Sequence, residues 1–198
     1  MSESFRNAFG GRVSAPSFPN GINPFQHHSP VNERERQAFI QWIIEHFQME
    51  IAQQRLFAGT FLFVEGVNRE QGEQAYRHFI RTLDRRIYGK ASERHSDRRP
   101  FKHVAMMEGG GITGRQVHYH SLFVNPIDRD YSEEHFKRLL QSEWSQLRLA
   151  MKNPDIAARI ERVYDLEGWV SYQCKFHTKD RSEGASLLEM VDITTLRI

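Results

Sequence analysis

The chain has little cysteine and no long hydrophobic run. Its one cysteine, Cys174, cannot form an intrachain disulfide framework or a cysteine-rich zinc site, and this usage is typical of a reducing compartment, so we expect a cytoplasmic protein. The longest apolar run, residues 61–64, is far shorter than the roughly 20 residues of a membrane helix. No charged-then-apolar signal segment opens the chain. We therefore expect no membrane partner.

The chain also has little excess charge: it holds 27 basic and 25 acidic residues, so its net charge is only +2. Any basic surface for nucleic acid must therefore be local. Aromatic residues are plentiful, with 14 Phe and 3 Trp, which excludes wholesale disorder. Four of the 7 prolines lie in residues 1–30, where no apolar period is seen. We predict a flexible N-terminal arm over residues 1–30, either a disordered tail or a segment that covers the domain or a partner, and one folded domain over residues 31–198.

The apolar pattern predicts the order of secondary structure in this domain. Helical spacing predicts helices over residues 32–55, from Asn68, from Ser132 and over 166–177, and strands are predicted over 56–64, 101–108, 117–124, 160–164 and 186–193. After the first helix, the order β-α-β-β-α-β is the split βαβ pattern of ferredoxin-like folds. We predict an α+β fold with a ferredoxin-like core, in which helices pack on one face of a central antiparallel sheet. The first helix and a C-terminal helix plus strand are additions to that core.

Two histidines and a glutamate are the first candidate site. His118 and His120 alternate with Tyr119 in the strand 117–124, so both imidazoles point to one face, about 7 Å apart along the strand, and Tyr119 points to the core. Alone, they could be two partly exposed residues of a sheet surface. Glu108 ends the preceding strand, and hairpin pairing should place it beside them. Two imidazoles and a carboxylate suit a divalent cation, Mn²⁺ or Mg²⁺.

The glycine-rich residues 109–114 between these strands do not form a nucleotide-binding loop. No Lys-Ser/Thr pair follows them, and they join two strands instead of entering a helix. We therefore expect a hairpin tip and no ATP hydrolysis.

Tyr172 and Lys175 are the second candidate site. They are three residues apart in the predicted helix 166–177 and share a helical face. A lysine charge beside a tyrosine would stabilise a tyrosinate or the charge on a phosphate that the tyrosine attacks. The alternative is that Tyr172 belongs to an apolar stripe with Trp169 and Phe176 and that Lys175 is solvated.

Together these positions resemble a known superfamily. Glu108, then the pair His118 and His120, then Tyr172 and Lys175 in a Y-x-x-K motif, resemble the HUH endonucleases, most closely the replication-initiator type with a single tyrosine. The resemblance implies a metal held by the two histidines and Glu108, with Tyr172 as the nucleophile and Lys175 as its support. It implies that Tyr172 attacks a single-stranded DNA phosphate, which leaves a 5′-phosphotyrosine and a free 3′-OH.

The function that we expect is sequence-specific nicking and rejoining of single-stranded or hairpin DNA at a replication origin, which starts rolling-circle replication of a plasmid, phage or mobile element. One alternative is a single-strand DNA transposase of the same superfamily. Another is a non-catalytic ferredoxin-like domain with aromatic residues that stack on bases. The sequence leaves the DNA site, the metal and the oligomeric state open.

A basic stretch between the helix predicted from Asn68 and the predicted hairpin is the candidate DNA contact. Its arginines and lysine are expected to bind the phosphate backbone, although a solvated loop has the same composition; the residues are Arg94, Arg98, Arg99 and Lys102.

Overall fold

The computed structural model describes residues 5–6, 12–13, 33–89, 102–109, 116–129, 131–179 and 191–192. In chain order the elements are β1 (Phe5–Arg6), β2 (Arg12–Val13), α1 (Glu33–Ala52), β3 (Leu56–Leu62), α2 (Arg69–Tyr88), β4 (His103–Glu108), β5 (His118–Val124), the 3₁₀ turn η2 (Ile127–Arg129), α3 (Glu133–Ser145), α4 (Pro154–Ala157), β6 (Ala158–Arg162), α5 (Leu166–Lys179) and β7 (Val191–Asp192). Among the described helices, none is both long and apolar enough to cross a membrane.

The central sheet has the strand order β6-β3-β5-β4-β7, and every neighbouring pair is antiparallel. β5 lies between the two strands of the β3-α2-β4 unit, and β3 lies between the two strands of the β5-α3-β6 unit. This interleaving confirms the predicted α+β fold with a ferredoxin-like split βαβ core. β7 adds two residues at the edge, beside β4.

Some predicted bounds differ from the observed ones. The strand predicted over residues 160–164 is β6 at Ala158–Arg162, because the single helical turn of α4 leads directly into it. Of the strand predicted over residues 186–193, only β7 lies within the described residues. Most of the predicted arm also lies outside them, and within it β1 pairs with β2.

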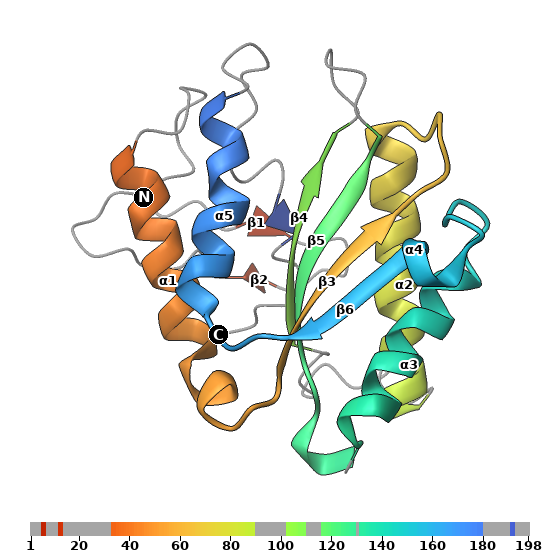
Figure 1. The fold of residues 1–198 in the computed structure, drawn as a ribbon, viewed down its shortest axis with the longest axis horizontal. Helices are drawn as coiled ribbons and strands as arrows, with labels where there is room; N and C mark the ends of the chain where they lie inside the picture. The colour runs from red at the N-terminus through yellow and green to blue at the C-terminus, as the bar shows by residue number, and fades with distance from the viewer. Residues whose placement is uncertain are drawn as a thin grey trace.

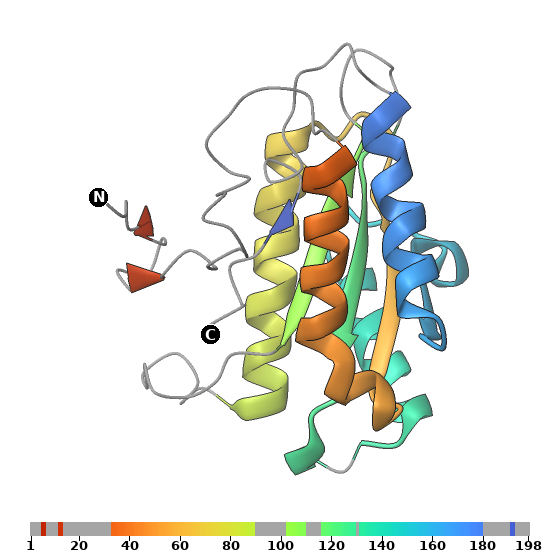
Figure 2. The same ribbon diagram turned by 90° about the vertical axis from the view of Figure 1, so that its left-hand side faces the viewer.

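Helices cover both faces of the sheet (Figure 1). The strands send Phe57, Phe61 and Phe123 into a core with α2 and α3 on one face. They send Leu56 and Leu122, among others, into a second core with α1 and α5 on the other face. Figure 2 shows α1 and α5 in front of the strands. The core helices α2 and α3 thus pack on one face as predicted, and the two added helices cover the opposite one.

The contacts of α2 fix the position of β5. The predicted capping box is present, since Asn68 Oδ1 accepts from the Gln71 amide at 2.9 Å and Gln71 Oε1 accepts from the Asn68 amide at 3.1 Å. Further along α2, Tyr76 stacks on Tyr119 with ring centroids 4.1 Å apart and donates a hydrogen bond to Ser121 Oγ at 2.9 Å. Tyr119 and Ser121 of β5 are both buried on this face, so the alternating residues His118 and His120 must face the other side of the sheet.

A lysine before β4 fastens α1 to the sheet. Lys102 Nζ donates to the His46 carbonyl oxygen and to Glu50 Oε1, both at 2.7 Å, and lies 4.8 Å from the centre of the Phe47 ring. Burial, and to a smaller extent the charge of Lys102, lower the pKa of His46 from 6.5 to about 4.

This histidine predicts a pH dependence of stability. Between pH 6.5 and about pH 4 the unfolded chain binds a proton at His46 that the folded chain does not, so acidification through this window lowers the free energy of unfolding. We expect His46→Gln to reduce the change of the free energy of unfolding with pH, measured by urea denaturation at several pH values. His78→Gln, at an exposed position of α2, should leave this slope unchanged. Equal slopes for wild type and His46→Gln would contradict this prediction.

Candidate metal centre

The pairing of β4 with β5 brings Glu108, His118 and His120 together. Glu108 is the cross-strand partner of His118, and His120 is two residues further along β5 on the same face. Tyr119 lies on the opposite face, buried in the α2–α3 core, as predicted. We call Glu108, His118 and His120 the metal cluster.

The three side chains converge on a small volume. Glu108 Oε2 is 3.4 Å from His118 Nε2 and 3.4 Å from His120 Nε2. One ligand atom from each residue can be chosen so that all three lie within 4.8 Å of one another. The side chains are 18%, 18% and 14% exposed for His118, Glu108 and His120, so the cluster is shielded but still reached by solvent.

The second ring nitrogen of His118 is held by the main chain. Its Nδ1 is 2.9 Å from the Gln116 carbonyl oxygen, which can only accept, so Nδ1 carries the proton. In the neutral ring the Nε2 lone pair then points toward Glu108. The Gln116 side chain in turn donates to the carbonyl oxygen of Phe63, the residue after β3, so Gln116 is bonded to the neighbouring chain segment.

The second ring nitrogen of His120 is held by a side chain. Its Nδ1 is 3.2 Å from Thr60 Oγ1, and Thr60 is the cross-strand partner of His120 on β3. A hydroxyl can donate or accept, so this contact alone does not place the ring proton. Thr60 is not among the site residues predicted from the sequence.

The cluster has a strong preference for a negative carboxylate. Burial by itself would raise the pKa of Glu108, but the protonated rings of His118 and His120 would hydrogen-bond to its charged form and attract it, and together they hold that pKa well below its ordinary value. Glu108 is therefore ionised at neutral pH and available as a ligand.

The cluster can hold a divalent metal ion. With Nδ1 protonated, neutral His118 turns a lone pair toward the Glu108 carboxylate, and these electron-rich atoms repel each other unless a proton or a cation lies between them. Two ligand atoms that share an ion at about 2.1 Å lie roughly 3.0–3.4 Å apart, which fits the two N···O distances of 3.4 Å. Metal-bound histidines also typically donate their other ring N–H to a carbonyl, as His118 does. Two imidazoles and one carboxylate suit several transition metals, and this donor set does not select one.

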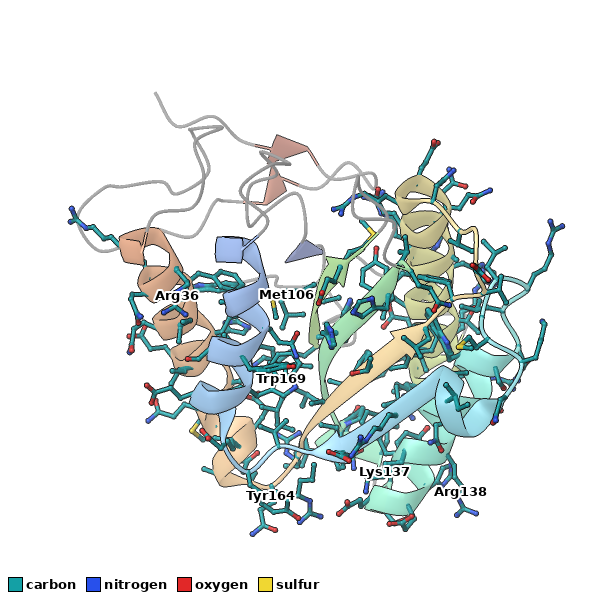
Figure 3. All side chains as sticks on the ribbon, turned by 45° about the horizontal axis from the view of Figure 1, so that its top comes forward. Arg36, Met106, Lys137, Arg138, Tyr164 and Trp169 are labelled. Atoms are coloured by element: carbon teal, nitrogen blue, oxygen red, sulfur yellow. The ribbon has the colours of Figure 1, made fainter. Side chains whose placement is uncertain are left out.

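Tyr172 is exposed on α5, the helix that covers the same sheet face as the metal cluster. Among the described side chains of α5, the buried apolar ones are Leu166, Val170 and Cys174, while Tyr172 is 54% exposed, so Tyr172 is not a core residue. Burial raises the pKa of the Cys174 thiol to about 12, in agreement with the predicted packing role. Trp169, one turn before Tyr172, packs between α5 and the sheet (Figure 3).

The other predicted site residues are placed less completely. Lys175 belongs to α5, but its side chain lies outside the described part of the chain, as do Arg94, Arg98 and Arg99. Lys102 is described, and it forms an ion pair with Glu50 of α1 at 2.7 Å with a side chain only 29% exposed. Its charge is therefore already paired with a carboxylate of α1.

Metal binding can be measured without any substrate. We expect wild type to bind Mn²⁺ in isothermal titration calorimetry and either His118→Ala or His120→Ala to abolish measurable binding, because each removes one of three ligands. Glu108→Gln should weaken binding less, because its amide oxygen keeps a neutral donor in place. His78→Ala, an exposed histidine of α2, is the control and should bind as wild type does. Native Mn²⁺ affinity in a His118→Ala/His120→Ala double variant would refute the site.

Comparisons with protein-family models, with curated proteins and with solved structures gave no significant match. The resemblance to the HUH endonucleases therefore depends on the positions of the metal cluster and of Tyr172.

Proposed function

We propose that this chain is a metal-dependent endonuclease that nicks and rejoins single-stranded DNA, with Tyr172 as its nucleophile. One observation carries the proposal: the metal cluster and an exposed tyrosine occupy the same side of the sheet, the first on β4 and β5 and the second on α5. The resemblance to replication initiators suggests that the substrate is an origin sequence in single-stranded or hairpin form.

Each group has a defined role in this reaction. Glu108, His118 and His120 would hold Mn²⁺ or Mg²⁺, and such an ion would neutralise and polarise the scissile phosphate. Tyr172 Oη attacks the phosphorus, forming an O–P bond as the bond from phosphorus to the 3′-oxygen breaks. The phenolic proton ends on the leaving 3′-oxygen, which becomes a free 3′-OH.

The reverse reaction reseals DNA with the same groups. A 3′-OH attacks the phosphotyrosine, a phosphodiester forms, and Tyr172 leaves with its proton restored. Each direction exchanges one phosphate ester for another, so no nucleotide has to be hydrolysed. The failure of residues 109–114 to match a nucleotide-binding loop agrees with this.

The sheet disfavours the non-catalytic alternative. A base-stacking domain needs exposed aromatic side chains on its sheet. The aromatic residues of β3 and β5 are instead buried against α2 and α3; they are Phe57, Phe61, Tyr119 and Phe123. On the opposite face the charged and polar metal cluster takes their place. A single-strand transposase would use the same groups and differs in its DNA substrate.

Tyr172→Phe tests the proposed nucleophile. The change deletes one oxygen at an exposed position, so we expect no loss of stability or of Mn²⁺ binding and complete loss of cleavage. The assay uses labelled single-stranded oligonucleotides with Mn²⁺ and a denaturing gel that detects both cut DNA and covalent adduct. Tyr164→Phe is the matched control, because Tyr164 is also exposed and lies just before α5.

A denaturant-resistant complex formed by Tyr172→Phe would exclude Tyr172 as the nucleophile. Lys175→Ala should differ from it: the nucleophile remains, so cleavage should slow by about 10²-fold, as for loss of one transition-state contact, and the adduct should still form.

The basic segment makes a separate prediction. Replacing Arg94, Arg98 and Arg99 together by alanine should weaken binding of a single-stranded oligonucleotide and reduce the slope of log affinity against log salt, because fewer counterions are released. Fluorescence anisotropy across a salt series measures this. An unchanged slope would show that these arginines do not contact phosphate.

A further inference from the structure

We propose that Thr60 is a positioning residue of the metal cluster: its hydroxyl accepts the Nδ1 proton of His120 and so leaves the Nε2 lone pair of that ring for the metal. The inference rests on the metal site of the proposed function. It does not depend on DNA or on Tyr172.

The backbone around Thr60 is held on both sides. β3 is an inner strand of the sheet, and Thr60 is paired with His120 on β5 and with Arg159 on β6. A threonine side chain is stiff about its first torsion. The hydroxyl therefore has a nearly fixed position, 3.2 Å from His120 Nδ1.

The chemistry of the two histidines decides the direction of this hydrogen bond in the metal-bound state. Nε2 of each ring faces Glu108 at 3.4 Å, so a shared ion must be bound through Nε2. A neutral imidazole that gives its Nε2 lone pair to a metal carries its proton on Nδ1. For His120 that proton points at Thr60, so the hydroxyl must accept it.

The two histidines differ in whether a substitution can remove the acceptor of their Nδ1 proton. His118 donates to the main-chain carbonyl of Gln116, which no substitution deletes. His120 donates to a side-chain hydroxyl, which one substitution deletes. Partners of this kind typically account for a factor of about 10 to 100 in metal affinity.

Thr60→Val removes the hydroxyl and keeps the shape of the side chain. We expect its Mn²⁺ affinity in calorimetry to fall by about 10- to 100-fold, and Thr60→Ala to lose a similar factor. Thr60→Ser keeps the hydroxyl and should retain most of the wild-type affinity. Thr82→Val is the matched control, because the Thr82 hydroxyl donates to the His78 carbonyl oxygen within α2, and we expect no change in affinity.

A second readout separates positioning from stability. In the Zn²⁺-loaded protein, ¹⁵N-edited NMR should show a slowly exchanging Nδ1 proton on His120, and Thr60→Val should accelerate its exchange. Unchanged Mn²⁺ affinity in Thr60→Val, or an equal loss in Thr60→Ser, would overturn the inference. So would a proton found on Nε2 of His120 in the Zn²⁺-loaded wild type.

The two proposals fail in different experiments. If Thr60→Val loses Mn²⁺ affinity but Tyr172→Phe still forms a DNA adduct, the Thr60 role stands and the proposed nucleophile falls. If Thr60→Val binds Mn²⁺ as wild type does and Tyr172→Phe is inactive, the Thr60 role falls and the nickase stands.

Discussion

The pairing register of β4 and β5 is the constraint on which the rest of the structure depends. It places Glu108 across from His118 and leaves His120 on the same face. A slip of one residue would turn both histidines into the α2–α3 core and bring Tyr119 out of it. Such a slip would be costly, because Tyr76 both stacks on Tyr119 and donates a buried hydrogen bond to Ser121, the next inward residue of β5. Packing on one face thus sets the chemistry of the other.

On the sheet face covered by α1 and α5, the ferredoxin-like core and the added helices supply different parts of the candidate site. The ferredoxin-like strands supply the metal cluster, while α5, which is not part of that core, supplies Tyr172. α1 packs beside α5 and is fastened to the sheet by Lys102, so the position of α5 is supported from the N-terminal side of the chain. The candidate nucleophile is held by a packed helix and not by a loop.

Local patterns predicted most of the fold and the metal cluster. The capping box at Asn68 and Gln71 and the alternation through Tyr119 are short-range features, and the hairpin made the approach of Glu108 predictable. Thr60 could not be predicted with the same means, because its contact with His120 depends on the register of strands 60 residues apart. The ion pair of Lys102 with Glu50 could not be predicted either, because tertiary packing brings α1 to this lysine. The exposure of Tyr172 likewise depends on which side of α5 meets the sheet.

The most direct measurement is to find where DNA becomes attached to the protein. The wild-type chain is incubated with a single-stranded oligonucleotide library and Mn²⁺, treated with nuclease and trypsin, and analysed by mass spectrometry. We predict that the nucleotide mass is found on the peptide that contains Tyr172, and that chelation of the metal prevents its attachment. Cleavage without an adduct, or an adduct on a different residue such as Tyr164, would contradict this mechanism.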